Sequence, residues 1–338
     1  MKISIEELRS LLKQAASKYV SEDESNYFAI EQVDTMLKKQ PRSGSFKDVL
    51  SDIKAWRDHE GNKIEIEAEK PASLLLNFHS LGPSLKLKYI HDQAESRAKQ
   101  NGISLIGINH GGVHTLNLWT DGLGKRDMIS IFMYNGGPEG VVPFGGTRGL
   151  FGTNPISYAI PTNEKPIIVD MATSDIPYFE ISDAKKENRQ LKPGVAVDKF
   201  GKMTTNPKEA LLEDGTSNLL PLGGGYKGYA IVLLAEILTG SLVRSLLSTE
   251  MSSDYIVEEH GGLLITIDIG SFTDITRFKK SVSEMCQEVR SQKPAEGVEQ
   301  VTIPGDRNYK KVDLLLRRGT IDLDEEQIAE LRELAAND

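Results

Sequence analysis

Apolar residues recur every three or four positions near the start of the chain, a spacing that predicts amphipathic helices. Ser4-x-x-Glu7 and Ser21-x-x-Glu24 are capping-box patterns, and each precedes one of these apolar runs. The first helix is expected to bury Leu8, Leu11, Leu12 and Ala15. The second, which should stop before residue 41, is expected to bury Phe28, Ile30, Val33 and Leu37. The pattern therefore predicts a helical N-terminal subdomain without visible chemistry.

Further along the chain, short apolar runs bounded by turn residues predict the strands of a buried sheet. These runs cover residues 64–67, 73–76, 103–108, 128–133, 156–159, 166–170 and 262–269. Helical spacing is found at residues 46–56, 84–101, 177–190, 226–247, 275–292, 312–318 and 324–336. The strongly apolar segment 226–247 is expected to be the central helix. Because helices and strands do not alternate strictly, a mixed α/β fold is favoured over a simple doubly wound sheet.

The composition is that of an ordinary globular protein, with 338 residues of which 39% are hydrophobic and 26% charged. A net charge of −9 argues against a nucleic-acid partner, which requires a basic surface. The lone cysteine, Cys286, excludes an internal disulfide and indicates a reducing compartment. The first residues lack an apolar signal segment, and the most apolar run, Ala230–Leu238, is too short for a bilayer. A cytoplasmic protein without a membrane partner is expected.

Three glycine-marked segments carry the clearest chemical signal. The first runs from Pro143-Phe144-Gly145-Gly146 to Gly152-Thr153-Asn154-Pro155, the second is 169–174, and the third, 221–228, leads into the apolar helix. Such turns offer free backbone N–H groups at the start of regular elements, as a phosphate-bearing cofactor requires. They predict a nicotinamide-dependent oxidoreductase whose cofactor lies across the three turns.

The third segment, Gly223-x-Gly225-x-x-Gly228, formally matches a dinucleotide fingerprint but lacks its context. No clear strand precedes it, and no strand with an acidic end follows about 20 residues later. A glycine turn that feeds a core helix is an equally good interpretation. Lys227 lies in the first helical turn and opposes the helix dipole, so an anionic ligand would explain its presence.

Candidate acid–base residues are few. Asp170 ends an apolar strand, where a carboxylate can bind a ribose, orient an imidazole or cap the next turn. His79, His110 and His114 lie in or near loops after predicted strands and are candidate general acids, although a loop histidine is more often simply solvated. His110 and His114 are not on a helix and have no carboxylate or cysteine close in sequence, so no metal site is predicted.

These motifs, in order and spacing, resemble the malate/L-lactate dehydrogenase family, which is distinct from the Rossmann-type lactate and malate dehydrogenases. The resemblance covers nearly the full length. It rests on 143–146, 152–155, 170–174, 221–228 and, in addition, Asn135, Asp198-x-x-Gly201, Thr204-Thr205-x-Pro207 and Ile303-Pro304-Gly305. The family includes ureidoglycolate and sulfolactate dehydrogenases, diketogulonate reductase and piperideine-carboxylate reductase.

The resemblance implies a non-Rossmann mixed-sheet fold, a homodimer, and a site near the subunit interface. It also implies hydride exchange between NADH or NADPH and a 2-oxo acid, a 2-hydroxy acid or a cyclic imino acid. Residues 116–284 should form a cofactor-binding part, and residues 1–115 with 285–338 a part for substrate binding and dimerisation. By position, the cofactor contacts should be Thr153 and Asn154 near the nicotinamide, with Asp170, Met171, Ala172, Thr173, Ser174, Tyr226, Lys227, Pro304, Gly305 and Asp306.

Two departures from the family pattern affect catalysis. The family's Ser-His-Gly-Val-x-Arg motif, whose histidine is the proposed proton donor, corresponds to Ser43–Asp48, with Gly44 in place of the histidine and Asp48 in place of the arginine. The family's histidine-bearing loop corresponds to Asn109–His114, with glycine at the usual position of the histidine. Both usual acids are therefore missing. The candidate catalytic residues that remain are His114, His110, His79 and Ser43.

Three interpretations stay open. Reduction of a ketone requires a proton donor, whereas reduction of a protonated imine yields a neutral amine without one. The protein is therefore an imine reductase, or a 2-oxo acid reductase in which another histidine supplies the proton, or a nucleotide-binding protein that has lost the redox step. Asp48 is compatible with a substrate that bears an amine, although an exposed helix carboxylate is the commoner explanation. The sequence does not distinguish NAD from NADP.

Overall fold

The protein is built around a mixed seven-stranded sheet. The computed structural model describes residues 1–39, 45–59, 61, 63–252 and 256–336. The strands follow the order β2-β3-β4-β8-β5-β6-β7, and β3 and β4 run parallel while the other neighbouring pairs run antiparallel. Their bounds are β2 Glu65–Lys70, β3 Ser73–Asn77, β4 Ile103–Asn109, β5 Met128–Tyr134, β6 Ile156–Ile160, β7 Ile167–Met171 and β8 Gly261–Asp268. The predicted mixed α/β class is confirmed.

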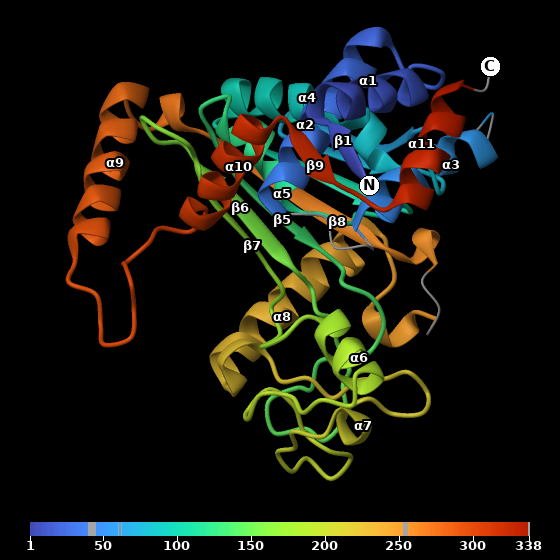
Figure 1. Cartoon of the computed structure of the whole chain (residues 1–338), viewed down its shortest axis with the longest axis vertical. Coiled ribbons are helices and arrows are strands. Elements are labelled where there is room, and N and C mark those ends of the chain that lie inside the picture. Colours follow the sequence, from blue (N-terminus) through green and yellow to red (C-terminus); the bar gives the residue numbers. More distant parts are fainter. Residues whose placement is uncertain (40–44, 60, 62, 253–255, 337–338) are drawn as a thin grey trace.

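Helices cover both faces of this sheet (Figure 1). The helices of the described chain are α1 Ile5–Ala16, α2 Glu22–Lys39, α3 Ser45–Asp58, α4 Leu87–Asn101, α5 Asn117–Gly124, α6 Tyr178–Lys186, α7 Pro207–Ala210, α8 Tyr226–Thr239, α9 Ile275–Ser291, α10 Asp306–Arg318 and α11 Glu325–Ala336. Alternate side chains of β3 separate the two faces: Leu74 and Leu76 join the core under α4 and α5, while Leu75 joins the cluster beside α8. The centre of the sheet is thus buried on both sides, whereas the edge strand β2 is largely exposed.

A second, helical core forms the N-terminal part. Apolar side chains of α1, α2, α3, α10 and α11 pack into one cluster, next to a small sheet of β1 (Lys2–Ser4) and β9 (Thr320–Asp322). The Ser21–Glu24 capping box is present in both directions, since the N–H of each residue donates to the side chain of the other. The predicted helical subdomain is therefore confirmed, although Ile30 points outward and is 37% exposed. The C-terminal helices complete this core (Figure 1).

A lobe with long loops, which carries α6 and α7, lies below the sheet in Figure 1. It has its own apolar cluster, in which Val141, Ile181 and Leu219 pack against Val232 of α8. The helix α8 therefore links the lobe to the sheet, because it also contacts β5 and β8. The sheet itself crosses the predicted boundary near residue 115, since β4 pairs with β8. The division into a substrate part and a cofactor part stays a prediction.

The helix α8 is shorter and more exposed than predicted. It ends at Thr239 because Gly240 leaves helical geometry, with φ −101° and ψ −94°. Within the described residues, Tyr226–Val243 is the one stretch apolar and long enough by composition to cross a membrane. The helix of 14 residues, however, is only about 21 Å long, less than the roughly 30 Å of a bilayer core. Its outer face leaves Ile231, Leu234 and Ile237 exposed, so only one side of this apolar helix packs against the rest of the chain.

Candidate active site

The strand β7 and its continuation bring together the segments predicted to hold a cofactor. At the start of β7, the Ile168 N–H donates to the Pro304 carbonyl at 3.5 Å. Past its end, the Thr173 N–H donates to the Thr153 carbonyl at 2.9 Å, and the Leu222 N–H donates to the Thr173 carbonyl at 2.8 Å. With a rise of about 3.3 Å per residue, these two meeting points lie roughly 16 Å apart along the strand. Residues 168–173 thus form one extended stretch that meets Pro304 at one end and Thr153 and Leu222 at the other. We call this stretch the cofactor track.

The N-terminus of α8 has the features of an anion-binding end. Gly225 caps the helix without a side-chain hydrogen bond, so the first backbone N–H groups have no partner within the helix. Lys227 is exposed, and no described carboxylate lies within ion-pair distance of it. Gly228 allows the turn to close against the helix, because a Cβ there would lie 2.0 Å from the Leu222 carbonyl oxygen. Tyr226 is exposed beside Phe144, with ring centroids 6.4 Å apart. A helix end of this kind can bind an anion.

The residues between the two ends contribute differently. Met171 is 39% exposed at the end of β7, and Ala172 is partly exposed next to it. The Ser174 side chain is buried and donates to the Ile176 carbonyl at 2.7 Å. The Thr173 hydroxyl donates to the Asn154 carbonyl at 3.0 Å. The hydroxyls of Thr173 and Ser174 are therefore engaged within the protein, whereas the Met171 side chain is exposed.

Asn154 supports the site from behind. It is fully buried with φ 32°, and its side-chain NH₂ donates to Glu236 of α8 at 2.6 Å. Its side-chain oxygen accepts the Gly136 N–H at 3.0 Å. Glu236 is itself buried and also accepts the Ser248 N–H at 2.6 Å. The Asn154 side chain thus joins the loop at Gly136 to helix α8.

A large pocket of about 600 Å³ lies at the other end of the track. Pro304, Asp306 and Tyr309 line it together with Lys165 and Arg290. Asp306 accepts two hydrogen bonds from Arg290, at 2.7 and 3.0 Å, and this pairing holds the pKa of its carboxyl below the ordinary value. The space is large enough for a nucleoside-sized group. Gly305 begins α10 with φ 100°, a conformation that favours glycine.

Asp170 connects the track to the neighbouring loop and helix. Its Oδ2 accepts the N–H of Asn117, the first residue of α5, at 3.0 Å, and lies 2.5 Å from the Lys39 Nζ at the end of α2. Asp170 therefore does not cap the following turn. The buried side-chain oxygen of Asn117 has no hydrogen-bond partner among the described residues. The loop that leads to Asn117 begins after β4 and contains His114.

His114 lines a pocket together with two carboxylates of α3. Its Nε2 lies 3.5 Å from Asp52 Oδ1 and its Nδ1 lies 3.8 Å from Asp48 Oδ1. Burial alone would lower the pKa of His114, but the hydrogen bond and charge of Asp52, together with the charge of Asp48, raise it. The pocket is tight, with space for about 20 Å³, close to one water molecule. A substrate ring would enter only if lining side chains move.

The other candidate catalytic residues lie elsewhere. The His79 side chain is 41% exposed, and its Nε2 lies 3.2 Å from Glu65 Oε2. His110 has φ 51° and bonds through Nδ1 to the Glu258 carbonyl at 2.5 Å. Neither residue lines the pocket of His114. Ser43 and Gly44 lie outside the described residues, so their predicted roles stay predictions.

The sequence analysis missed Asp52, although a signal was present. Asp48 and Asp52 are four residues apart on α3, which places both carboxylates on one face of the helix. Ser84 donates its hydroxyl to Asp52 and fixes that carboxylate. The i, i+4 spacing could have identified the pair, but the proximity of His114 depends on the tertiary fold.

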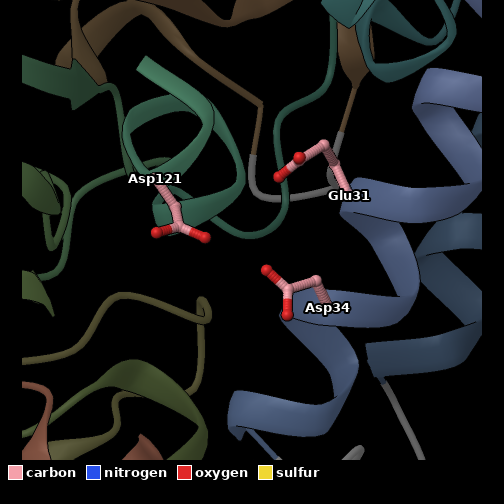
Figure 2. A group of neighbouring side chains, drawn as sticks. All are labelled: Glu31, Asp34 and Asp121. Atoms are coloured by element: carbon pink, nitrogen blue, oxygen red, sulfur yellow. The ribbon is translucent and has the colours of Figure 1, made fainter. Parts of the chain in front are cut away.

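A separate acidic group joins α2 to α5. Figure 2 shows Glu31 and Asp34 of α2 pointing toward Asp121 of α5. Lys38 pairs with Asp34 and Asp121, while Lys125 contacts all three acids at 2.5 to 3.0 Å. The two ammonium groups supply the positive charge that a cation would otherwise bring, so this is an ion-pair network between helices.

Comparison with known proteins places these features in context. The family model described as malate/L-lactate dehydrogenase matches residues 3–332. The chain is 35% identical over 345 residues to the malate/(S)-sulfolactate dehydrogenase of Methanothermus fervidus, with 99% of this chain and 97% of that protein covered. It is 31% identical over 246 residues to the Delta(1)-pyrroline-2-carboxylate/Delta(1)-piperideine-2-carboxylate reductase of Pseudomonas putida, covering 71% and 68%.

The fold agrees with a solved structure of the same kind. The sulfolactate dehydrogenase of Methanocaldococcus jannaschii superposes with a TM-score of 0.82 at 27% sequence identity. The superposition covers 99% of this chain and 96% of that structure. The mixed sheet with its helical N-terminal part is therefore the architecture of these dehydrogenases.

Proposed function

The chain belongs to the malate/L-lactate dehydrogenase family and is an NAD(P)-dependent oxidoreductase, and on this premise we propose that it reduces a small C=N or C=O compound with His114 as the proton donor. The observation that carries the proposal is the position of His114. It lies in a pocket with two carboxylates, on the loop that leads into Asn117, whose N–H binds Asp170 of β7. The pocket therefore adjoins the middle of the cofactor track.

We place the cofactor along β7, with its nucleoside end in the large pocket at Pro304–Asp306 and its pyrophosphate at the start of α8. The unpartnered N–H groups of that helix and Lys227 would hold the negative charge. The backbone at Thr153 and Met171 would border the ring. A bound reduced nicotinamide supplies the hydride that the reduction requires.

His114 is suited to hold and deliver a proton. Asp52 and Asp48 raise its pKa, so the imidazolium persists closer to neutral pH than an isolated histidine would allow. Asp52 is fixed by Ser84 and therefore keeps the ring in place. The imidazolium can protonate a ketone oxygen or an imine nitrogen that enters the pocket. The residue thus performs the task of the acids that the family motifs lack here.

The working form that we propose is a cytoplasmic homodimer that uses the outer face of α8. Ile231, Leu234 and Ile237 repeat along one side of the helix, and Leu242 and Leu246 extend the apolar surface beyond it. A monomer rarely leaves such a continuous apolar surface in water. A second copy fits this surface because an isologous contact would pair the helix with itself.

Turnover with a panel of cyclic imines and 2-oxo acids, each with NADH and NADPH, tests the proposal. We expect consumption of the reduced cofactor with at least one of these substrate classes. Substitution His114→Gln should lower kcat by about 10²-fold or more, the usual contribution of a positioned acid, while binding of the cofactor stays unchanged. Cofactor binding without turnover of any compound would instead favour a protein that has kept the cofactor-binding site and lost the redox activity.

A further inference from the structure

The pocket of His114 carries more negative charge than its own histidine can balance. The ionisable side chains among its described lining residues are those of Asp48, Asp52 and His114. Two of these side chains are carboxylates and none is a lysine or an arginine. Even with His114 protonated, this part of the pocket keeps a net charge of about −1.

The two carboxylates have different surroundings. Asp52 is 8% exposed as a side chain, accepts the Ser84 hydroxyl and lies against His114 Nε2. Asp48 is 42% exposed as a side chain and, within the described residues, has His114 at 3.8 Å as its only ion-pair contact. Asp52 is therefore committed to His114, whereas Asp48 keeps capacity to accept further hydrogen bonds at the open side of the pocket.

We propose that this pocket selects a substrate whose reacting group is an iminium, the cationic form of an imine, and which has no carboxylate beside that group. Asp48 is the residue that binds the positively charged group. This inference rests on the proposed function and narrows its substrate class. An iminium carries a positive charge and an N–H group that donates a hydrogen bond. The Asp48 carboxylate balances that charge and accepts that hydrogen bond. A substrate carboxylate in the same place would instead meet two like charges at short range.

The chemistry of reduction agrees with this charge pattern. In an iminium the C=N carbon accepts a hydride from NADH or NADPH, and the π electrons pass to nitrogen. The C=N bond becomes C–N, a C–H bond forms, and the positive charge disappears as the neutral amine is produced. The oxidised nicotinamide carries that positive charge away, so atoms and electrons balance without another reactant. A neutral imine that enters the pocket first takes a proton from the His114 imidazolium at its nitrogen, and the two carboxylates beside His114 stabilise the resulting iminium for hydride transfer.

A matched pair of non-reacting ligands tests the charge selection directly. Piperidine is a cation at pH 7.5, and piperidine-2-carboxylate has the same ring and ammonium with an added carboxylate. Their binding can be followed by tryptophan fluorescence, because Trp119 lines the pocket. We expect piperidine to bind at least tenfold more tightly. Asp48→Asn should reduce this ratio to near one, while the control Asp58→Asn, an exposed acid at the end of the same helix, should leave it unchanged.

Turnover gives a second readout with 1-piperideine and 1-piperideine-2-carboxylate as substrates. We expect kcat/KM to favour 1-piperideine at least tenfold, and Asp48→Arg to reverse the preference. Equal or tighter binding of the carboxylated ligand, an Asp48→Asn ratio equal to that of the wild type, or binding of neither ligand would overturn the inference. Because the fluorescence titrations need no cofactor, failure of NADH and NADPH to bind would overturn the proposed function separately.

Discussion

Lys39 and Asp170 form an ion pair, with Nζ 2.5 Å from Oδ2, that ties the end of α2 to the strand at the centre of the cofactor track. We expect the substitutions Lys39→Met and Asp170→Asn to be coupled by about 1 kcal/mol in the free energy of unfolding, since the pair is partly buried. Urea unfolding of the two single variants and the double variant measures this coupling. Additive effects would mean that the two side chains do not interact in solution.

The protonation state of His114 can be measured directly. We expect its imidazole to titrate above the ordinary histidine pKa near 6.5, because Asp52 and Asp48 outweigh the effect of burial. NMR titration of the ring C–H signal, assigned with His114→Gln, checks this. Asp52→Asn should lower this pKa, because the hydrogen bond and the charge of Asp52 both favour the imidazolium. Unchanged titration in Asp52→Asn would show that this carboxylate does not act on the ring.

The same sign predicts how His114 affects stability. A pKa raised in the folded state stabilises the fold fully below the unfolded value near 6.5, and this contribution is lost as the pH rises through the folded-state pKa. His91 behaves in the opposite way. Burial, aided by the charge of Arg126, lowers its pKa to about 3, although the hydrogen bond between its Nε2 and the Trp119 carbonyl acts in the other direction.

Acidification should therefore destabilise the protein through His91. Between pH 7.5 and 5 the unfolded chain binds a proton that the folded site refuses, at a loss of about 2 kcal/mol. Urea unfolding at both pH values measures the difference. In His91→Gln the same pH change should reduce the free energy of unfolding by about 2 kcal/mol less than in the wild type. Parallel losses in both proteins would assign the acid sensitivity to other groups.

The proposed dimer makes a prediction about α8. A carboxylate at Leu234 or Ile237 would have to be buried in the apolar contact, so the double substitution Leu234→Glu, Ile237→Glu should give monomers. Light scattering during size-exclusion chromatography reads the mass. Leu314→Glu on α10 is the matched control, because this leucine is also exposed, at 65%. A wild-type monomer, or a double variant that stays dimeric, would remove α8 from the interface.

Local signals in the sequence predicted much of the fold because they act over a few residues. The Ser21–Glu24 box is present as predicted, and the predicted helix 275–292 corresponds to α9. Helix α5 was not predicted, since its glycines suggest a loop. Tertiary packing explains why this helix contains glycines. A Cβ at Gly122 would lie 2.6 Å from the His91 ring, and a Cβ at Gly124 would lie 2.9 Å from Ala159, so both positions lack room for a side chain.

The candidate site was predicted less completely, for a similar reason. The segments of the cofactor track could be found because each is marked by glycines or a strand end. The choice among His79, His110 and His114 could not be made, because it depends on which loop meets α3. Periodicity likewise carried the predicted α8 past Gly240, where the backbone turns. The periodicity of apolar residues carries no information on which distant segments come into contact, and these contacts decide both features.

Calorimetric titration with NADH and NADPH tests the central claim, that separate turns along β7 form one cofactor site. The account predicts saturable binding of at least one of the two. Lys227→Ala should weaken that binding about tenfold or more, since an ammonium–phosphate contact is lost. The exposed control Lys63→Ala should bind like the wild type. Absence of heat with both nucleotides, confirmed by unchanged nicotinamide fluorescence, would contradict the account.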